Sequence, residues 1–191
     1  MTKLDTRSLL LISAAVVINI VASQATTLLK IPLYFDAIGT FIVAILCGPL
    51  AAALAGLLTN VIAGITFSPV GLPFAPVAMV VGLVAGWLAR IGGFRTWWRA
   101  MLSGVVVGIP TTLLATPIIV FLFGGVTGSG TDFAPAYMLA LGSTLLKSVF
   151  LTNLASSLVD KSLTGLIAFI VANRLPLRIS TSFRFFVHSK A

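Results

Sequence analysis

The chain has 191 residues, of which 59% are hydrophobic and only 8% are charged, and its formal net charge is +8. A soluble domain carries roughly 25% charged residues, so this composition excludes an ordinary soluble fold. The apolar residues form continuous runs, long enough to cross a hydrocarbon core as helices and without the alternation of lipid-facing barrel strands. We therefore predict an all-α membrane protein.

Clear breakers separate the first five apolar segments. We expect helices at about 8–29, 34–47, 50–66, 73–91 and 97–123. Pro32 follows the first of them, Gly48 and Pro49 make a tight turn between the second and third, and a basic loop precedes the fifth. The first segment could pass for a secretory signal, but we expect it to be retained because its apolar run continues to Leu29.

The last apolar stretch, about 133–173, is ambiguous. It could be one long helix, a short helix leading into a span, or two spans. Charge placement favours one final span at about 140–174, because six spans put nine of the twelve Lys and Arg residues on the cytoplasmic side. We therefore predict a single domain of six transmembrane helices with both termini cytoplasmic and a basic cytoplasmic tail at 177–191.

The sequence also argues against several classes of function. Its positive charge lies in loops and tail, a pattern that fits anionic lipid rather than nucleic acid. Cys47 is the single cysteine and His188 the single histidine, so we expect no disulfide and no metal site. There is no Walker loop, zinc-protease motif or nucleophile elbow, so we expect no catalytic residue, no enzyme activity and no cofactor.

Four of the predicted spans carry a polar side chain at a similar height. With about 1.5 Å of rise per residue, Asp36 and Asn60 stand roughly 17 Å from the turn between the second and third helices. By the same rise, Asn19 stands about 18 Å from the start of the first helix, and Asp160 about 21 Å from the end of the last. Polar groups at such depth usually face the bundle interior and are candidates for function.

Other polar and aromatic residues lie farther toward the outer side. Gln24 is about one turn beyond Asn19, and Asn153 and Lys147 lie higher on the last helix. The outer loops add aromatic side chains, Tyr34 among them, that could stack on a planar ligand or form an aromatic belt at the headgroups.

A structural role is the alternative for the acidic members of this layer. Asp36 or Asp160 could pair with Lys161 and serve helix packing alone.

Two blocks of sequence carry a family resemblance. The first is IPLYFDAIGT at 31–40, followed by GPL at 48–50 and GLLTN at 56–60, and the second is NLASSLVDK at 153–161, followed by LP at 175–176. They resemble the second, third and sixth helices of substrate-binding S components of energy-coupling factor (ECF) transporters.

The resemblance implies a six-helix S component that binds a vitamin or related micronutrient from outside, in a bacterial plasma membrane. It implies as partners a transmembrane T component and two cytoplasmic ATPase subunits, and a site under the loops at 30–34, 67–73 and 124–132. With the polar layer, it gives these candidate substrate-binding residues: Asn19, Gln24, Tyr34, Asp36, Thr40, Asn60, Lys147, Asn153 and Asp160.

The first helix departs from the family pattern. Many members carry an Ala-x-x-x-Ala face there for docking the T component, whereas here Ala14 is followed by Ile18 and Ala22 by Thr26. The departure argues against a shared coupling module. It leaves open a dedicated module, or a non-transporting membrane sensor or partner-docking module with an S-component-like fold.

Overall fold

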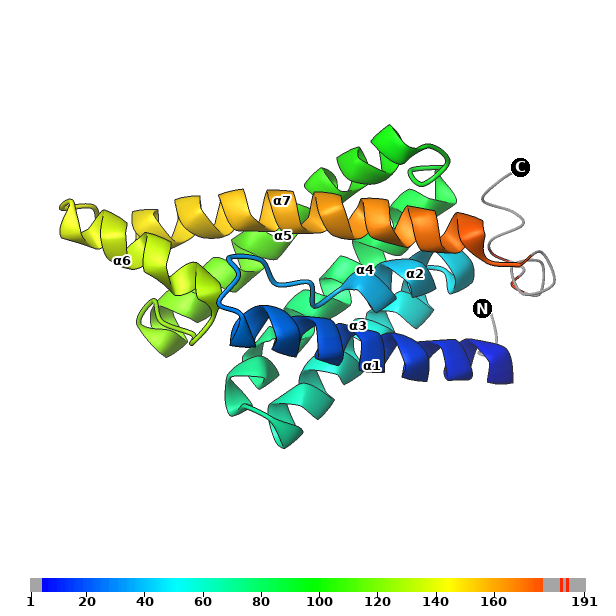
Figure 1. The fold of residues 1–191 in the computed structure, drawn as a ribbon, viewed down its shortest axis with the longest axis horizontal. Helices are drawn as coiled ribbons and strands as arrows, with labels where there is room; N and C mark the ends of the chain where they lie inside the picture. The colour runs from blue at the N-terminus through cyan, green and yellow to red at the C-terminus, as the bar shows by residue number, and fades with distance from the viewer. Residues whose placement is uncertain (1–4, 177–182, 184, 186–191) are drawn as a thin grey trace.

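The computed structural model describes residues 5–176 together with Phe183 and Phe185. These residues form helices and their connections (Figure 1). The helices are α1 (Thr6–Leu28), α2 (Ile38–Cys47), α3 (Pro49–Thr66), η1 (Pro69–Phe74), α4 (Ala75–Arg90), α5 (Trp97–Phe123), η2 (Gly130–Asp132), α6 (Phe133–Ala140) and α7 (Leu145–Arg174). Apart from the two phenylalanines, the predicted basic tail at 177–191, with His188, lies outside the described residues.

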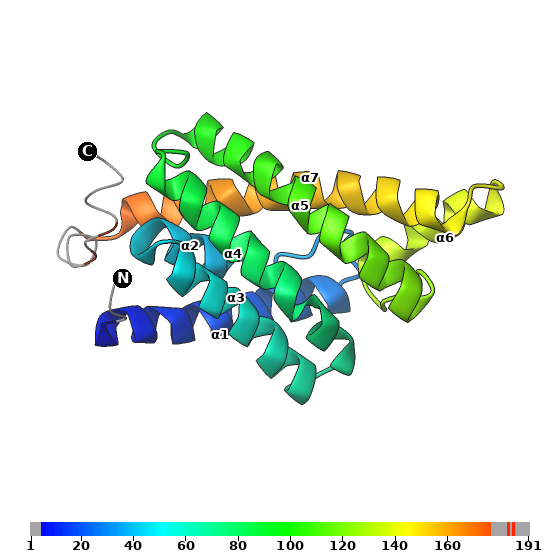
Figure 2. The ribbon, with the colours of Figure 1, turned by 180° about the vertical axis from the view of Figure 1, so that it is seen from behind.

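The short helix α2 is the centre of the bundle. It packs against α1, α3, α4 and α7, and eight of its ten residues are buried. Viewed from behind, α3, α4 and α5 cover one side of the molecule, and α5 packs along α7 (Figure 2). The start of α1 and the end of α7 lie at the same end of the bundle (Figure 1).

The packing of α5 on α7 depends on a glycine. A Cβ at Gly104 would lie 2.0 Å from the carbonyl oxygen of Lys161, so the two backbones touch where any side chain would separate them. This contact fixes the position of the α7 turn that carries Asp160 and Lys161.

The bundle exposes apolar side chains on its outside, including Leu10, Val17 and Val21 on α1. Five stretches of the described chain are long and apolar enough to cross a membrane: α1, α3, η1 with α4, α5 and α7. The sixth predicted span corresponds to α2, whose ten residues make only about 15 Å of helix. By length alone, α2 does not cross a hydrocarbon core of about 30 Å.

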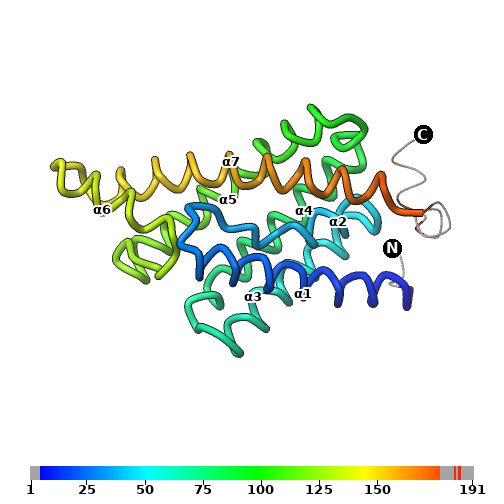
Figure 3. Tube along the Cα trace, viewed as in Figure 1, coloured from blue at the N-terminus to red at the C-terminus, as the bar shows by residue number. Residues whose placement is uncertain are grey.

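Three boundaries differ from those predicted from sequence. α2 begins at Ile38 rather than at residue 34, because the chain before it is bonded to α7 in a non-helical form. α4 begins at Ala75, after the 3-10 helix η1, rather than at residue 73. The ambiguous last stretch is a short helix, α6, that leads into the long helix α7, and α7 begins at Leu145 rather than at residue 140 (Figure 3).

Candidate functional site

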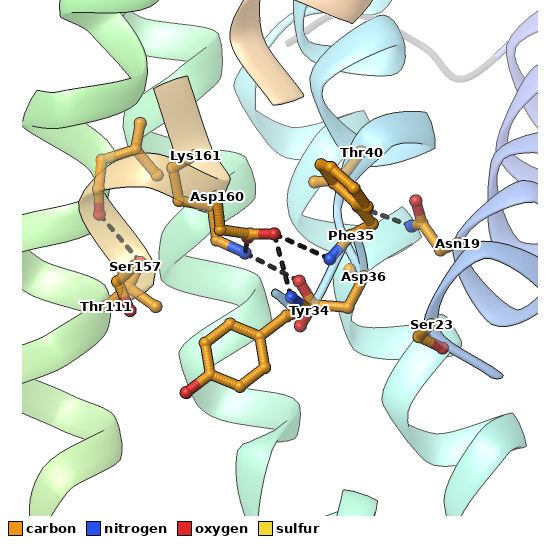
Figure 4. Close-up of polar contacts among 12 residues, drawn as sticks. Asn19, Ser23, Tyr34, Phe35, Asp36, Thr40, Thr111, Ser157, Asp160 and Lys161 are labelled. Atoms are coloured by element: carbon orange, nitrogen blue, oxygen red, sulfur yellow. Dashed lines mark hydrogen bonds and ion pairs between the residues drawn. The ribbon is translucent and has the colours of Figure 1, made fainter. Parts of the chain in front are cut away.

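A non-helical segment, residues 31–37, connects α1 to α2 and forms one wall of the site. The backbone N–H groups of Tyr34 and Phe35 donate to Asp160 Oδ1 over 3.0 and 2.8 Å (Figure 4). The Thr26 hydroxyl donates to the Tyr34 carbonyl over 3.0 Å. Phe35 has a φ of 45°, a left-handed conformation that is uncommon for residues other than glycine. These bonds hold the segment in place of a first helical turn.

An ionic cluster joins this segment to α7. Lys161 Nζ lies 2.7 Å from Asp36 Oδ1 and 2.6 Å from Asp160 Oδ2. The Lys161 and Asp160 side chains are 2% and 0% exposed, whereas the Asp36 side chain is 41% exposed. Burying charges costs several kcal/mol per ion unless they are paired and hydrogen-bonded, and both conditions are met here. We call Asp36, Asp160 and Lys161 the acidic triad.

The exposed side of Asp36 faces a cavity of about 200 Å³, the core cavity. Its walls combine apolar side chains with a few polar ones, as is common in small-molecule sites. On the apolar side, Phe74 is stacked on Phe123 with ring centroids 5.9 Å apart. The lining residues used below are Tyr34, Asp36, Asn60, Phe74, Val77, Val81, Thr111, Ile119, Thr127, Ser129, Asn153, Ser157 and Lys161.

A second cavity of about 340 Å³, the loop cavity, shares Tyr34, Asp36 and Asn60 with the first. It is lined by the ends of α1 and α3 and by the loops that follow α1, α3 and α5. These loops lie at the end of the bundle opposite the start of α1 (Figure 3). The two cavities are therefore neighbours, one at the loops and one toward the middle of the bundle, and Asp36 lines both.

The loops after α1 and α5 meet over this path. A Cβ at Gly130 would lie 2.4 Å from the Ile31 carbonyl oxygen, so the loops touch backbone to backbone. Lys30 Nζ donates to the Gly128 carbonyl over 3.3 Å. Asp132 accepts from the Gly128 N–H over 2.6 Å and holds the second loop in shape.

A hydrogen-bond network lines the α7 side of the core cavity. The Tyr34 hydroxyl donates to Asn153 Oδ1 over 3.1 Å and lies 3.4 Å from Thr131 Oγ1. Ser157 also donates to Asn153 Oδ1, over 3.3 Å, and Asn153 Nδ2 donates to Thr116 Oγ1 over 3.3 Å. The polar wall is thus held together by bonds within the protein.

Comparison with protein families adds the decisive observation. A family model described as "ECF transporter, substrate-specific component" matches residues 7–176. The chain belongs to this family. A search of curated proteins and a search of solved structures each gave no significant match.

As a substrate-specific component of an ECF transporter, the chain is a multi-pass membrane protein that acts in transport together with T and ATPase components. The predicted family resemblance is confirmed. Of the fold prediction, the all-helical character is seen throughout the described residues, and five spans have the required length.

The structure brings most of the predicted site residues together. Tyr34, Asp36, Asn60 and Asn153 line the core cavity, and Gln24 lines the loop cavity. Asp160 lies behind this wall, fully buried, and contacts Tyr34 and Lys161 rather than the cavity.

Three predicted residues lie elsewhere. Asn19 is fully buried between α1, α2 and α3, where its Nδ2 donates to Thr40 and Thr59 over 2.9 and 3.0 Å. Its Oδ1 accepts from the Gly39 N–H over 2.7 Å, so both Asn19 and Thr40 serve helix packing. Lys147 is exposed in a separate groove beside Pro117.

Sequence reasoning did not name four hydroxyl groups of the core-cavity wall, those of Thr111, Thr127, Ser129 and Ser157. Ser157 follows Asn153 by four residues, so both lie on one face of α7, and that spacing could have found it. Thr111 follows Pro110 in an otherwise apolar helix and carries no such signal.

Proposed function

We propose that this S component captures a small, water-soluble micronutrient of the vitamin type from the outer side of the bacterial plasma membrane. The ligand enters by the loop cavity and rests in the core cavity. A T component and two ATPase subunits then drive its uptake. The observation that carries the proposal is that the partly exposed carboxylate of Asp36 lines both the loop cavity and the core cavity.

The proposed topology has six crossings and both termini in the cytoplasm. Segment 31–37 and α2 together form the second crossing, since the chain returns through them from the end of α1 toward the end where α1 begins (Figure 1). The basic residues Arg90, Arg99 and Arg174 then lie on the inner side, in agreement with the positive-inside tendency.

Uptake of labelled vitamins by cells that express the chain tests the proposal. We expect accumulation with the T component and active ATPases, and none when the lysine of each ATPase Walker loop is substituted. Uptake that continues with the inactive ATPases would contradict the scheme. Native mass spectrometry of the purified protein, which detects a copurified small molecule, identifies the ligand.

The rival function is a membrane sensor or docking module that does not transport. One observation favours it: Ile18, at the position where the family's docking face has a second alanine, is 42% exposed on α1. Tight ligand binding without uptake, in the presence of every candidate coupling subunit, would support this rival.

A further inference from the structure

The acidic triad is unbalanced in charge. Asp36 and Asp160 contribute two negative charges, and Lys161, which contacts both, contributes one positive charge. An unbalanced charge beside an apolar cavity attracts a counter-charge strongly, because the low dielectric screens it weakly. The protein supplies no second cation to the triad among its described residues.

Asp36 is the member of the triad that is most exposed to a ligand. Asp36 is 41% exposed, and its Oδ1 accepts from Lys161, while no bond to its Oδ2 is found among the described residues. Lys161 also lines the core cavity, but its side chain is only 2% exposed and its Nζ lies within 2.7 Å of both carboxylates, so they balance its charge. The ligand therefore meets a carboxylate oxygen.

The nearest other lysines do not alter this balance. Lys30 donates to a carbonyl of the neighbouring loop and is not among the residues that line either cavity. Lys147 lines a different groove.

The hydroxyl groups that line the core cavity are bonded within the protein, those of Thr127 and Ser129 to Asp132. The hydroxyls of Tyr34 and Ser157 donate to Asn153, and the Thr111 hydroxyl donates to the Val107 carbonyl over 2.8 Å. Their hydrogen atoms are thus used within the protein. Asn60 donates only a long bond of 3.4 Å to its own helix, and within the described chain its Oδ1 accepts none. The Asn60 amide can thus still donate and accept, and the charged group of the wall with an oxygen left for a ligand is the Asp36 carboxylate.

We infer that the ligand is a small organic cation with N–H donors, an inference that rests on the proposed function. Its charged group lies on Asp36 Oδ2, and its apolar body lies against Phe74, Val77 and Ile119. Binding completes the charge balance of the acidic triad. An anion of the same size would place its charge against the carboxylate and be excluded.

Three probes of nearly one shape test the charge preference: benzamidinium, benzamide and benzoate. We expect benzamidinium to bind the purified full chain in nanodiscs at least about ten-fold more tightly than benzamide, measured by titration calorimetry, with benzoate weakest. Equal binding of the three, tighter binding of benzoate, or binding of none to a protein of native circular dichroism would overturn the inference.

Variants then assign the preference to one residue. Asp36→Asn leaves Lys161 paired with Asp160 in a neutral cluster, and we expect it to bind benzamidinium and benzamide alike. Asp36→Glu keeps the charge, and we expect it to retain the preference. Asp5→Asn removes an exposed carboxylate at the start of α1, far from the triad in sequence, and we expect it to retain the preference as well. A preference that survives Asp36→Asn would refute the assignment.

The inference and the proposed function can fail separately. ATP-driven uptake of an anion or a neutral compound, unaffected by Asp36→Asn, would overturn the inference and leave the proposed function intact. A cation preference that depends on Asp36, in a chain that gives no ATP-driven uptake, would overturn the proposed function and leave the inference intact.

Discussion

Two polar clusters of this bundle stand at a similar height and differ in what they leave unsatisfied. Around Asn19, every amide bond is made inside the protein, to Thr40, Thr59 and Gly39. Around Asp36, one carboxylate oxygen and a surplus negative charge face a cavity. Depth in the membrane therefore identifies polar clusters but does not tell their roles apart. A cluster that can bind a ligand is one that faces a cavity and keeps unused hydrogen-bonding capacity or unbalanced charge.

The largest expected effect comes from removing Asp160, which supports the cluster around Asp36. Asp160→Ala leaves two backbone N–H groups without their acceptor and removes one partner of Lys161. Breaking a buried ion pair from one side costs about 3–5 kcal/mol. We expect the thermal unfolding transition in detergent, followed by circular dichroism, to fall steeply. Asp5→Ala serves as the control, and an unchanged transition in Asp160→Ala would contradict the anchoring role.

Asn19→Leu tests the cluster around Asn19, whose hydrogen bonds are all made inside the protein. The substitution leaves the Gly39 N–H without its acceptor, and an unsatisfied buried donor costs about 1–3 kcal/mol. We expect lower thermal stability and, in the folded fraction, unchanged affinity for the molecule that copurifies. A selective loss of affinity at full stability would place Asn19 in the binding site and remove the contrast between the clusters.

Asn60→Ala tests the opposite expectation, a loss of ligand affinity with little loss of stability. Asn60 lines both cavities and makes only one long bond to its own helix, so the fold loses little. A ligand loses one hydrogen bond, worth about 1 kcal/mol or roughly five-fold in affinity. Calorimetry with the copurified molecule measures this loss, and Asn19→Leu supplies the matched asparagine control. Affinity equal to that of the unsubstituted chain would remove Asn60 from the site.

The smallest expected effect is that of Lys147→Gln. Its side chain is exposed, in a groove separate from the core cavity. We expect neither thermal stability nor ligand affinity to change beyond measurement error. A clear loss of affinity would show that the groove beside Pro117 communicates with the site.

The helices were largely predictable, because long apolar runs and the Gly48-Pro49 turn are local signals. The non-helical segment before α2 was not predictable from local sequence. Its backbone bonds go to Asp160, which lies 126 and 125 residues away from Tyr34 and Phe35. The stretch from 34 to 47 contains no proline to mark the boundary, and the predicted start of α2 was therefore wrong.

The site was predictable in part for a related reason. Asn19 and Asn60 are the same residue type at similar heights, and only the packing of the helices decides which one faces the cavity. The pairing of Lys161 with either Asp36 or Asp160 was foreseen as an alternative. In the structure Lys161 contacts both carboxylates, so the cluster has two negative charges and one positive charge.

The contact between Asp36 and Lys161 also sets an order of events during biosynthesis. The two residues are 125 positions apart, so at about 5–20 residues per second the carboxylate is made roughly 6–25 s before its partner. Until α7 joins the bundle, segment 31–37 lacks the side chain that holds its backbone. A chain truncated before α7 therefore lacks both the cation that pairs with Asp36 and the carboxylate that holds the backbone of segment 31–37.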